Sequence, residues 1–354
     1  MYLCTVDKYF QREKIKMTAV AFKQAAQKQD PAVFDYAREV EQVWRDFPEK
    51  KDKLYFLDLC AKEMLVYPGD AKRKEEIRQW MSAERIILPS AELFRTVLKG
   101  SGYMPSHGTM LLYTQENKYP FLDKKAFQAQ ETMFAFDHEL GHAIIPNALP
   151  ADGSENIAES IADAYAVVRH LQRYGAESSV IDALAGNRTF RFIFKKDMLH
   201  LTSPVVEKIL ARRYEIAWDS LTPAETTQLA RRFALEYAVH PVLLDVIDKD
   251  FKKLQGKTDD IEKGDVSPLQ ELAEIVLSTE VSAVFKYGAV ALKFCLDGQA
   301  ADIILTGDYW DNVRRKLAEK QKIFAAQDKL LFGMGAKDRL LQRNVAGNVI
   351  KFKL

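Results

Sequence analysis

Apolar residues recur every three to four positions through most of the chain, which is the spacing of one buried face of an α-helix. Proline and glycine interrupt this pattern and mark the ends of the predicted helices. The clearest helices are predicted over residues 31–47, 54–66, 91–99, 124–145 and 154–174. Two later segments, Thr222–Glu225 and Ser267–Gln270, have the residues of a capping box with proline at the first helical position. The pattern therefore predicts a mainly α protein.

Residues 109–114 depart from the helical pattern. Their sequence, Thr-Met-Leu-Leu-Tyr-Thr, is short, apolar and partly aromatic or β-branched, which favours a strand. The flanking residues 101–108 and 115–120 have the composition of loops. Because this strand directly precedes the helix predicted over 124–145, we expect an α+β fold with a small sheet beside that helix.

The length of 354 residues exceeds what one hydrophobic core usually serves. We expect a helical N-terminal region over 1–100, a central region over 101–200, and a large helical C-terminal lobe over 201–354. Two lobes are expected to meet between the helices predicted over 124–145 and 154–174, because ligand-binding clefts commonly lie at such junctions.

The hydrophobic content and the net charge of the chain exclude several classes of protein and of binding partner. Hydrophobic residues make up 47% of the chain and charged residues 29%, which excludes an intrinsically disordered protein. The 51 lysines and arginines are balanced by 50 aspartates and glutamates, and a net charge of +1 gives no field that attracts nucleic acid or an anionic membrane. No stretch of sequence is long and uncharged enough to span a bilayer. We therefore expect neither nucleic acid nor a membrane as a partner.

The spacing of the cysteines and the composition of the N-terminus indicate the cellular compartment. Cys4, Cys60 and Cys295 lie far apart and form no disulfide framework, which favours a reducing compartment. The first 16 residues mix charged and apolar side chains and lack the apolar core of a secretory signal. We expect a cytoplasmic protein, with export by a specialised secretion system as the alternative.

Residues 138–142 read His-Glu-Leu-Gly-His within the helix predicted over 124–145. Positions i and i+4 of a helix lie one turn apart on the same face, so His138 and His142 can bind one zinc ion together. Glu139 lies about 100° around the helix from His138. It can therefore reach a zinc-activated water without binding the metal, and it can take the proton as that water attacks a carbonyl.

A zinc site of this kind needs a third protein ligand. The next predicted helix has three acidic residues at intervals of four, Glu155, Glu159 and Asp163, among small and apolar residues. Metal-bound histidines commonly donate their second N–H group to a carboxylate. The simplest assignment makes Glu159 the third ligand and Asp163 the partner of His138 or His142. Glu155 and Asp163 are the competing choices of third ligand.

An HExxH motif followed by a helix with Glu-x-x-x-Asp resembles the gluzincin zinc metallopeptidases, the thermolysin-like group. The resemblance implies a zincin-like core with a single Zn2+ ion bound by His138, His142 and Glu159. It also implies that Glu139 is the general base and acid, and that Asp163 supports a histidine. The matching region is less than a fifth of the chain.

The same resemblance, which spans residues 108–170, implies a binding mode for substrate. In that family the substrate adds as an extra strand at the edge of a sheet beside the HExxH helix, and residues 109–114 are the natural counterpart of that edge strand. The chain lacks the Gly-x-Met-Glu-Asn signature of aminopeptidases. We therefore expect an endopeptidase.

A second group usually stabilises the charge that develops on the carbonyl oxygen during hydrolysis, often a His, Tyr or Arg. Candidates are His200, Tyr165 and His240, and His107 is a further candidate for contact with substrate. We select His200 as the second catalytic residue, because it lies in a loop before a predicted helix start at Ser203 and can point into a cleft. A purely structural role is the alternative at each of these positions.

Taken together, the motifs predict a zinc-dependent metallopeptidase that hydrolyses peptide bonds in a peptide or protein substrate. A catalytically silent zinc-binding or interaction protein is one alternative. A metal-dependent phosphohydrolase of the HD type is another, although that class requires a His-Asp pair where this chain has His138-Glu139. The sequence predicts neither the cleavage specificity nor the oligomeric state.

Overall fold

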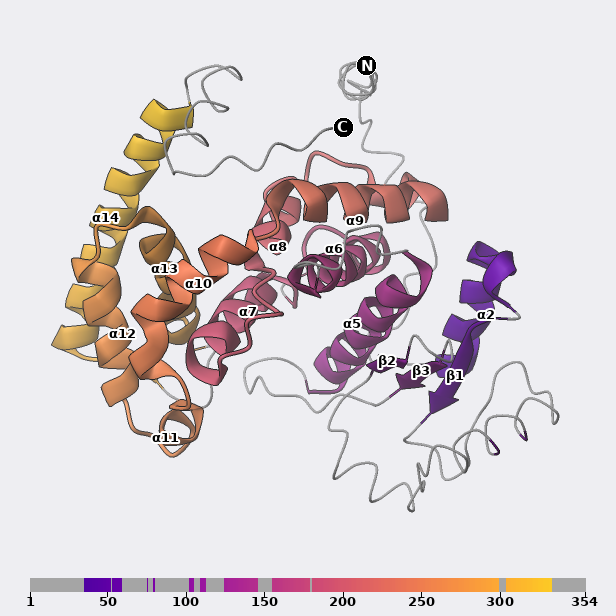
Figure 1. Cartoon of the computed structure of the whole chain (residues 1–354), viewed down its shortest axis with the longest axis horizontal. Helices are drawn as coiled ribbons and strands as arrows, with labels where there is room; N and C mark the ends of the chain where they lie inside the picture. The colour runs from indigo at the N-terminus through magenta and orange to yellow at the C-terminus, as the bar shows by residue number, and fades with distance from the viewer. Residues whose placement is uncertain are drawn as a thin grey trace.

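The computed structural model of the chain (Figure 1) describes residues 75 and 79 and the ranges 35–51, 53–58, 102–104, 109–112, 124–145, 155–178, 180–298 and 304–332. Most of these residues are helical, which confirms the prediction of a mainly α protein. The helix predicted over 91–99 and the candidate His107 lie outside the described residues. None of the described helices combines the length and the apolar character needed to cross a membrane.

Helix α6 is central to the first half of the structure and contacts α5, α8 and α9. The helices up to residue 237 are α2 (Tyr36–Asp46), α5 (Lys124–Ile144), α6 (Glu155–Tyr174), α7 (Asp182–Lys195), α8 (Ser203–Leu210) and α9 (Pro223–Tyr237). The helices that follow are α10 (Pro241–Phe251), α11 (Thr258–Glu262), α12 (Ser267–Ser278), α13 (Ser282–Leu296) and α14 (Asp308–Phe332). Short 3-10 turns are η2 (Pro48–Lys50), η4 (Trp218–Ser220) and η5 (Lys252–Leu254).

The capping box predicted from the sequence is present at the start of α9 but not at the start of α12. At α9 the predicted capping box is present: Glu225 N–H donates to Thr222 Oγ1 at 3.3 Å, and Thr222 N–H donates to Glu225 Oε2 at 2.9 Å. The capping box predicted at Ser267 is wrong. Ser267 is already the first helical residue of α12, and its N–H donates to Asp265 Oδ1 at 2.9 Å.

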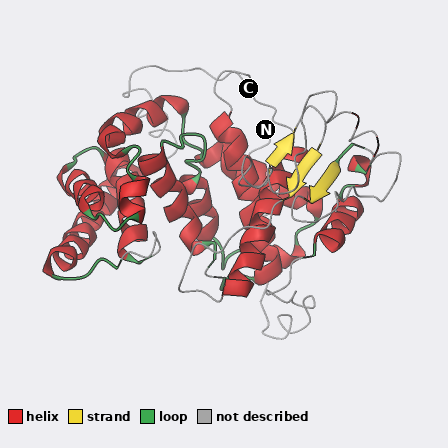
Figure 2. Ribbon diagram, turned by 90° about the horizontal axis from the view of Figure 1, so that it is seen from below, coloured by secondary structure: helices red, strands yellow, loops and turns green. Residues whose placement is uncertain are grey.

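Three short strands form a mixed sheet next to α5 (Figure 2). They are β1 (Tyr55–Asp58), β2 (Gly102–Met104) and β3 (Thr109–Leu112), in the order β1-β3-β2. β1 runs parallel to β3, with Tyr55 opposite Thr109. β2 runs antiparallel to β3, with Gly102 opposite Leu111.

The helix predicted over 54–66 is wrong at its start, because residues 55–58 form β1. A short run of large apolar and aromatic residues suits a buried strand as well as a buried helix, and periodicity alone does not separate the two. Phe56 is buried, and its ring stacks on that of Phe136 of α5 with centroids 6.1 Å apart. This contact fixes β1 against the helix that carries the HExxH motif.

Two further expectations for the sheet region need correction. The loop predicted over 101–108 contains β2. The strand predicted over 109–114 is present as β3, but it lies between β1 and β2 and is paired on both sides. The backbone of β3 is therefore not a free edge to which a substrate strand could add.

Buried apolar side chains form two clusters. The first joins α2, β1, α5, α6, α8 and α9, and the second joins α10 to α14. Helix α7 belongs to both, since Ala185 packs in the first cluster while Phe192 and Phe194 pack in the second. The division at residues 100 and 200 stays a prediction. Helices α8 and α9 follow residue 200 but pack with the first cluster.

Helices α5 and α6 approach each other closely at Gly141. A Cβ atom at this position would lie 2.9 Å from Ala162 Cα, closer than a side chain tolerates, and 3.3 Å from Tyr165 Cβ. The glycine inside the HExxH motif therefore allows the helix with both histidines to lie directly against the helix with Glu159.

Candidate metal centre

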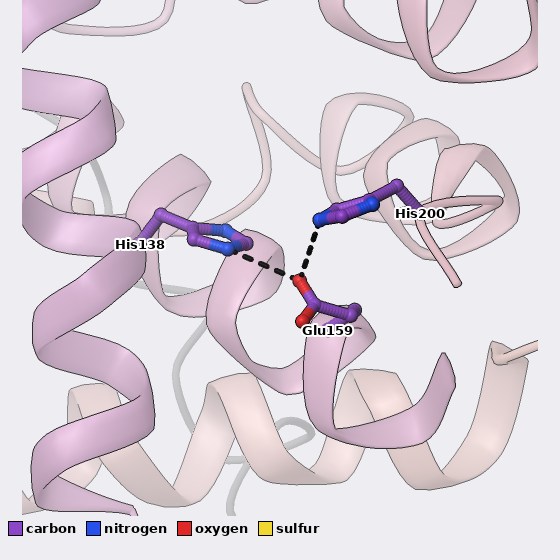
Figure 3. A group of neighbouring side chains, drawn as sticks. All are labelled: His138, Glu159 and His200. Atoms are coloured by element: carbon purple, nitrogen blue, oxygen red, sulfur yellow. Dashed lines mark ion pairs between the residues drawn. The ribbon is translucent and has the colours of Figure 1, made fainter. Parts of the chain in front are cut away.

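His138 of α5 and Glu159 of α6 face each other, and His200 reaches the same carboxylate from the loop before α8 (Figure 3). The Nε2 atoms of His138 and His200 each lie 3.1 Å from Glu159 Oε2. His142 Nε2 lies 3.5 Å from Glu159 Oε1 and 3.3 Å from His138 Nε2. Ligand atoms of His138, Glu159 and His200 all lie within 4.8 Å of one another, which is close enough for one metal ion.

The contacts of Glu159 have the spacing of ligands around a common ion. Two ligands at about 2.0–2.1 Å from a tetrahedral zinc ion lie roughly 3.3 Å apart, and the distances here are 3.1 to 3.5 Å. Glu159 Oε2 is buried, yet it forms no hydrogen bond of normal geometry with any described group. A buried carboxylate oxygen whose contacts lack hydrogen-bond geometry is costly. A bound cation would remove that cost, so these residues fit a metal ion.

Asp163 orients His138 and is itself held by two other groups. Its Oδ1 atom lies 2.7 Å from His138 Nδ1, which leaves Nε2 to face Glu159. Asp163 is fully buried, and Arg188 of α7 donates to both of its oxygens, Nη2 to Oδ1 at 2.6 Å and Nε to Oδ2 at 2.8 Å. Thr202 Oγ1 also donates to Oδ2. Asp163 thus pairs with the first histidine of the motif, not the second.

The electrostatics of the site favour two negative carboxylates. Burial opposes ionisation of Asp163, but Arg188 and His138 outweigh burial and lower the pKa of this carboxyl. Burial likewise opposes ionisation of Glu159, and the surrounding imidazoles lower its pKa far below the usual range. Burial alone would lower the pKa of His138, but the charge and hydrogen bond of Asp163 raise it to about 10. Two charged carboxylates attract a cation, and a metal ion bound to His138 would take the place of the proton that the raised pKa keeps on this imidazole.

His200 is held in a similar way. Its Nδ1 atom lies 2.6 Å from Asp197 Oδ1, and Arg191 Nη2 of α7 lies 2.6 Å from Asp197 Oδ2. The loop itself is fixed to α6, because Asn156 Nδ2 donates to the carbonyl oxygen of Leu199 at 2.8 Å. Asp197 therefore holds the imidazole of His200, and Asn156 holds the backbone of the loop that carries it.

The remaining acidic residues of the motif and of α6 lie in different surroundings. Glu139 is half-buried on α5 directly after His138, and its negative charge acts on that imidazole. Glu155, one competing third ligand, is exposed at the start of α6. Asp163, the other candidate for third ligand, accepts hydrogen bonds from Arg188 and Thr202. Glu159 is the acidic residue of α6 that approaches both histidines of the motif.

The other candidates for the oxyanion-stabilising role lie in different surroundings. Tyr165 is 1% exposed and packs in the first hydrophobic cluster beside Gly141. His240 is exposed directly before α10. Of the candidates that the structure describes, it places His200 against Glu159.

Sequence reasoning missed the residues that hold the site in place, which include Arg188, Asp197 and Asn156. Arg188 and Arg191 are a sequence signal for such residues, because two arginines three positions apart on an apolar helix indicate acidic partners nearby. Phe190, Phe192 and Phe194 of the same helix are buried in the second hydrophobic cluster. The side chains of Arg188 and Arg191 instead contact Asp163 and Asp197.

Comparison with known proteins adds no relative. No protein-family model matches the sequence, and no curated protein or solved structure matches it either. Any functional assignment therefore depends on the motif residues and on the side chains around Glu159.

Proposed function

We propose that this protein is a zinc-dependent metallopeptidase of the gluzincin type, with one Zn2+ ion held by His138, His142 and Glu159. One observation carries the proposal: the imidazoles of the HExxH motif converge on Glu159, whose buried Oε2 atom forms no hydrogen bond of normal geometry with a described group. Two histidines and one glutamate are a ligand set of catalytic zinc sites, which keep a further position open.

The residues around the ion have distinct parts in hydrolysis. Zinc bound there would polarise a substrate carbonyl and lower the pKa of a water molecule. Glu139 takes a proton from the attacking water as the new C–O bond forms, and gives it to the amide nitrogen as the C–N bond breaks. Asp163 keeps His138 in the tautomer that presents Nε2, and Arg188 with Thr202 fixes Asp163 in that position.

The proposed substrate is an extended segment of a peptide or protein, and the proposed fold of this region is a zincin-like core. The sheet beside α5 supports both proposals, because an extended peptide can add to the edge of a sheet. Of the described strands, β1 and β2 lie at the edges. Cleavage within a chain, rather than at its amino end, is expected for such a binding mode.

Metal removal tests this proposal. Protein stripped of metal with a chelator should lose cleavage of an unfolded protein substrate, and one equivalent of Zn2+ should restore it. Mg2+ at the same concentration should not, because a site with two imidazoles suits zinc rather than a hard, oxygen-preferring cation. Mass spectrometry of the products would identify internal cleavage sites. Full activity in metal-free protein, or no cleavage by zinc-loaded protein, would reject the proposal.

A further inference from the structure

His200 and His138 share one pattern of partners. Each Nδ1 atom lies within hydrogen-bond distance of an aspartate, His200 with Asp197 at 2.6 Å and His138 with Asp163 at 2.7 Å. Each aspartate is in turn contacted at 2.6 Å by an arginine of α7. One helix therefore supports two imidazoles through two matching arginine–aspartate pairs.

Both imidazoles also present Nε2 to the same atom. Each Nε2 lies 3.1 Å from Glu159 Oε2, and the two ring centroids are 6.3 Å apart. An imidazole that donates through Nδ1 to a carboxylate has Nε2 available for a metal ion, and this pairing is the usual support of a metal-bound histidine. The ligand atoms of His138, Glu159 and His200 fall within 4.8 Å of one another. His200 thus meets the conditions that identify His138 as a ligand.

The loop around His200 is anchored by contacts with α6. Asn156 of α6 holds the carbonyl oxygen of Leu199, the residue before it, at 2.8 Å. Thr202, two residues after it, donates to Asp163. The side chain of His200 is nevertheless 27% exposed, whereas that of His138 is 8% exposed. The loop is anchored at both sides, while the imidazole keeps access to solvent.

We propose that His200 binds the same cation as His138 and Glu159, the residues whose ligand atoms lie within 4.8 Å of one another. With His142, which lies 3.5 Å from Glu159, the resting site then has three histidine ligands and one glutamate. This inference rests on the proposed zinc site and replaces the oxyanion-stabilising role predicted from the sequence. Four protein ligands leave a substrate oxygen room only as a fifth ligand or in place of one of the four. His200 is the ligand suited to give way, because its side chain is 27% exposed, more than those of His138, His142 and Glu159.

Metal affinity, measured separately from activity, tests this inference. Zinc affinity would be determined by competition with a chromophoric chelator, and the Co2+ form would be compared by its absorption spectrum. We expect His200→Ala to weaken zinc binding by more than about 100-fold, because loss of a ligand should exceed the roughly 10- to 100-fold effect of an outer partner. It should also change the intensity of the Co2+ bands. The exposed His240 gives the matched control: His240→Ala should leave the zinc affinity and the Co2+ spectrum unchanged.

A second variant keeps the test decisive if His200→Ala folds poorly. Asp197→Asn retains the imidazole and removes its charged partner, and it should weaken zinc binding by about 10- to 100-fold. Unchanged zinc affinity and an unchanged Co2+ spectrum in these variants would overturn the ligand role and leave the peptidase proposal standing. Loss of turnover alone in His200→Ala would then identify an oxyanion-stabilising group. Failure of the wild-type protein to bind zinc would overturn both proposals.

Discussion

A Glu139→Gln variant is expected to lose about 10²- to 10⁴-fold in peptide hydrolysis, the range that a positioned general base contributes. Glutamine has nearly the size of glutamate but accepts no proton from water. Glu139 lies next to His138 on α5 and is not among the groups that converge on Glu159 Oε2, so zinc content should stay at one equivalent. The measurements are kcat and KM with a fluorogenic peptide, and metal content by elemental analysis.

The control for charge removal is Glu271→Gln on α12, another half-buried glutamate that belongs to a helix of the second hydrophobic cluster. Its turnover should equal that of the wild type. Equal turnover in Glu139→Gln and wild-type protein would contradict the assigned role. A zinc-loaded wild type that cleaves no peptide would favour the catalytically silent alternative.

Asp163→Asn is expected to destabilise the metal-free protein by about 3–5 kcal/mol, because it leaves the buried charge of Arg188 without its partner. The side chains of Asp163 and Arg188 are 0% and 10% exposed, so water does not replace the lost interaction. The same variant should weaken zinc binding by about 10- to 100-fold, because His138 loses the carboxylate that orients it. Urea denaturation of the metal-free protein and a zinc competition titration measure the two effects.

The second arginine–aspartate pair provides the matched control for stability. Asp197→Asn makes the same chemical change, but the side chain of Arg191 is 40% exposed and can be solvated. Its cost to the free energy of unfolding should therefore be about 1 kcal/mol or less. Equal destabilisation by Asp163→Asn and Asp197→Asn would contradict the view that burial of the first pair sets its contribution.

The helices of the site could be predicted because their signals are local. The spacing of His138 and His142 places both imidazoles on one face, and the four-residue interval from Glu159 to Asp163 does the same on the next helix. Glycine at position 141 permits the close approach of these helices. Each of these features can be read within about two helical turns of sequence.

What the sequence did not predict depends on contacts between distant segments. β1 pairs with β3 across more than fifty residues, so a short apolar run at 55–58 could not be distinguished from the start of a helix. The pairing of Asp163 with Arg188 also joins separate helices, so the arginine on an apolar helix indicates an acidic partner but not which residue it is. His200 was selected from its place in a loop, but its approach to Glu159 depends on how that loop is fixed to α6.

The zinc content of purified variants tests the convergence of the two helices on one ion most directly. Wild-type protein and His240→Ala, dialysed against zinc and then against buffer, should each retain one equivalent per chain. His138→Ala and Glu159→Ala should retain close to none, because each removes a ligand from the centre of the cluster. Stoichiometric zinc in both of these variants would contradict the site and the hydrolysis assigned to it.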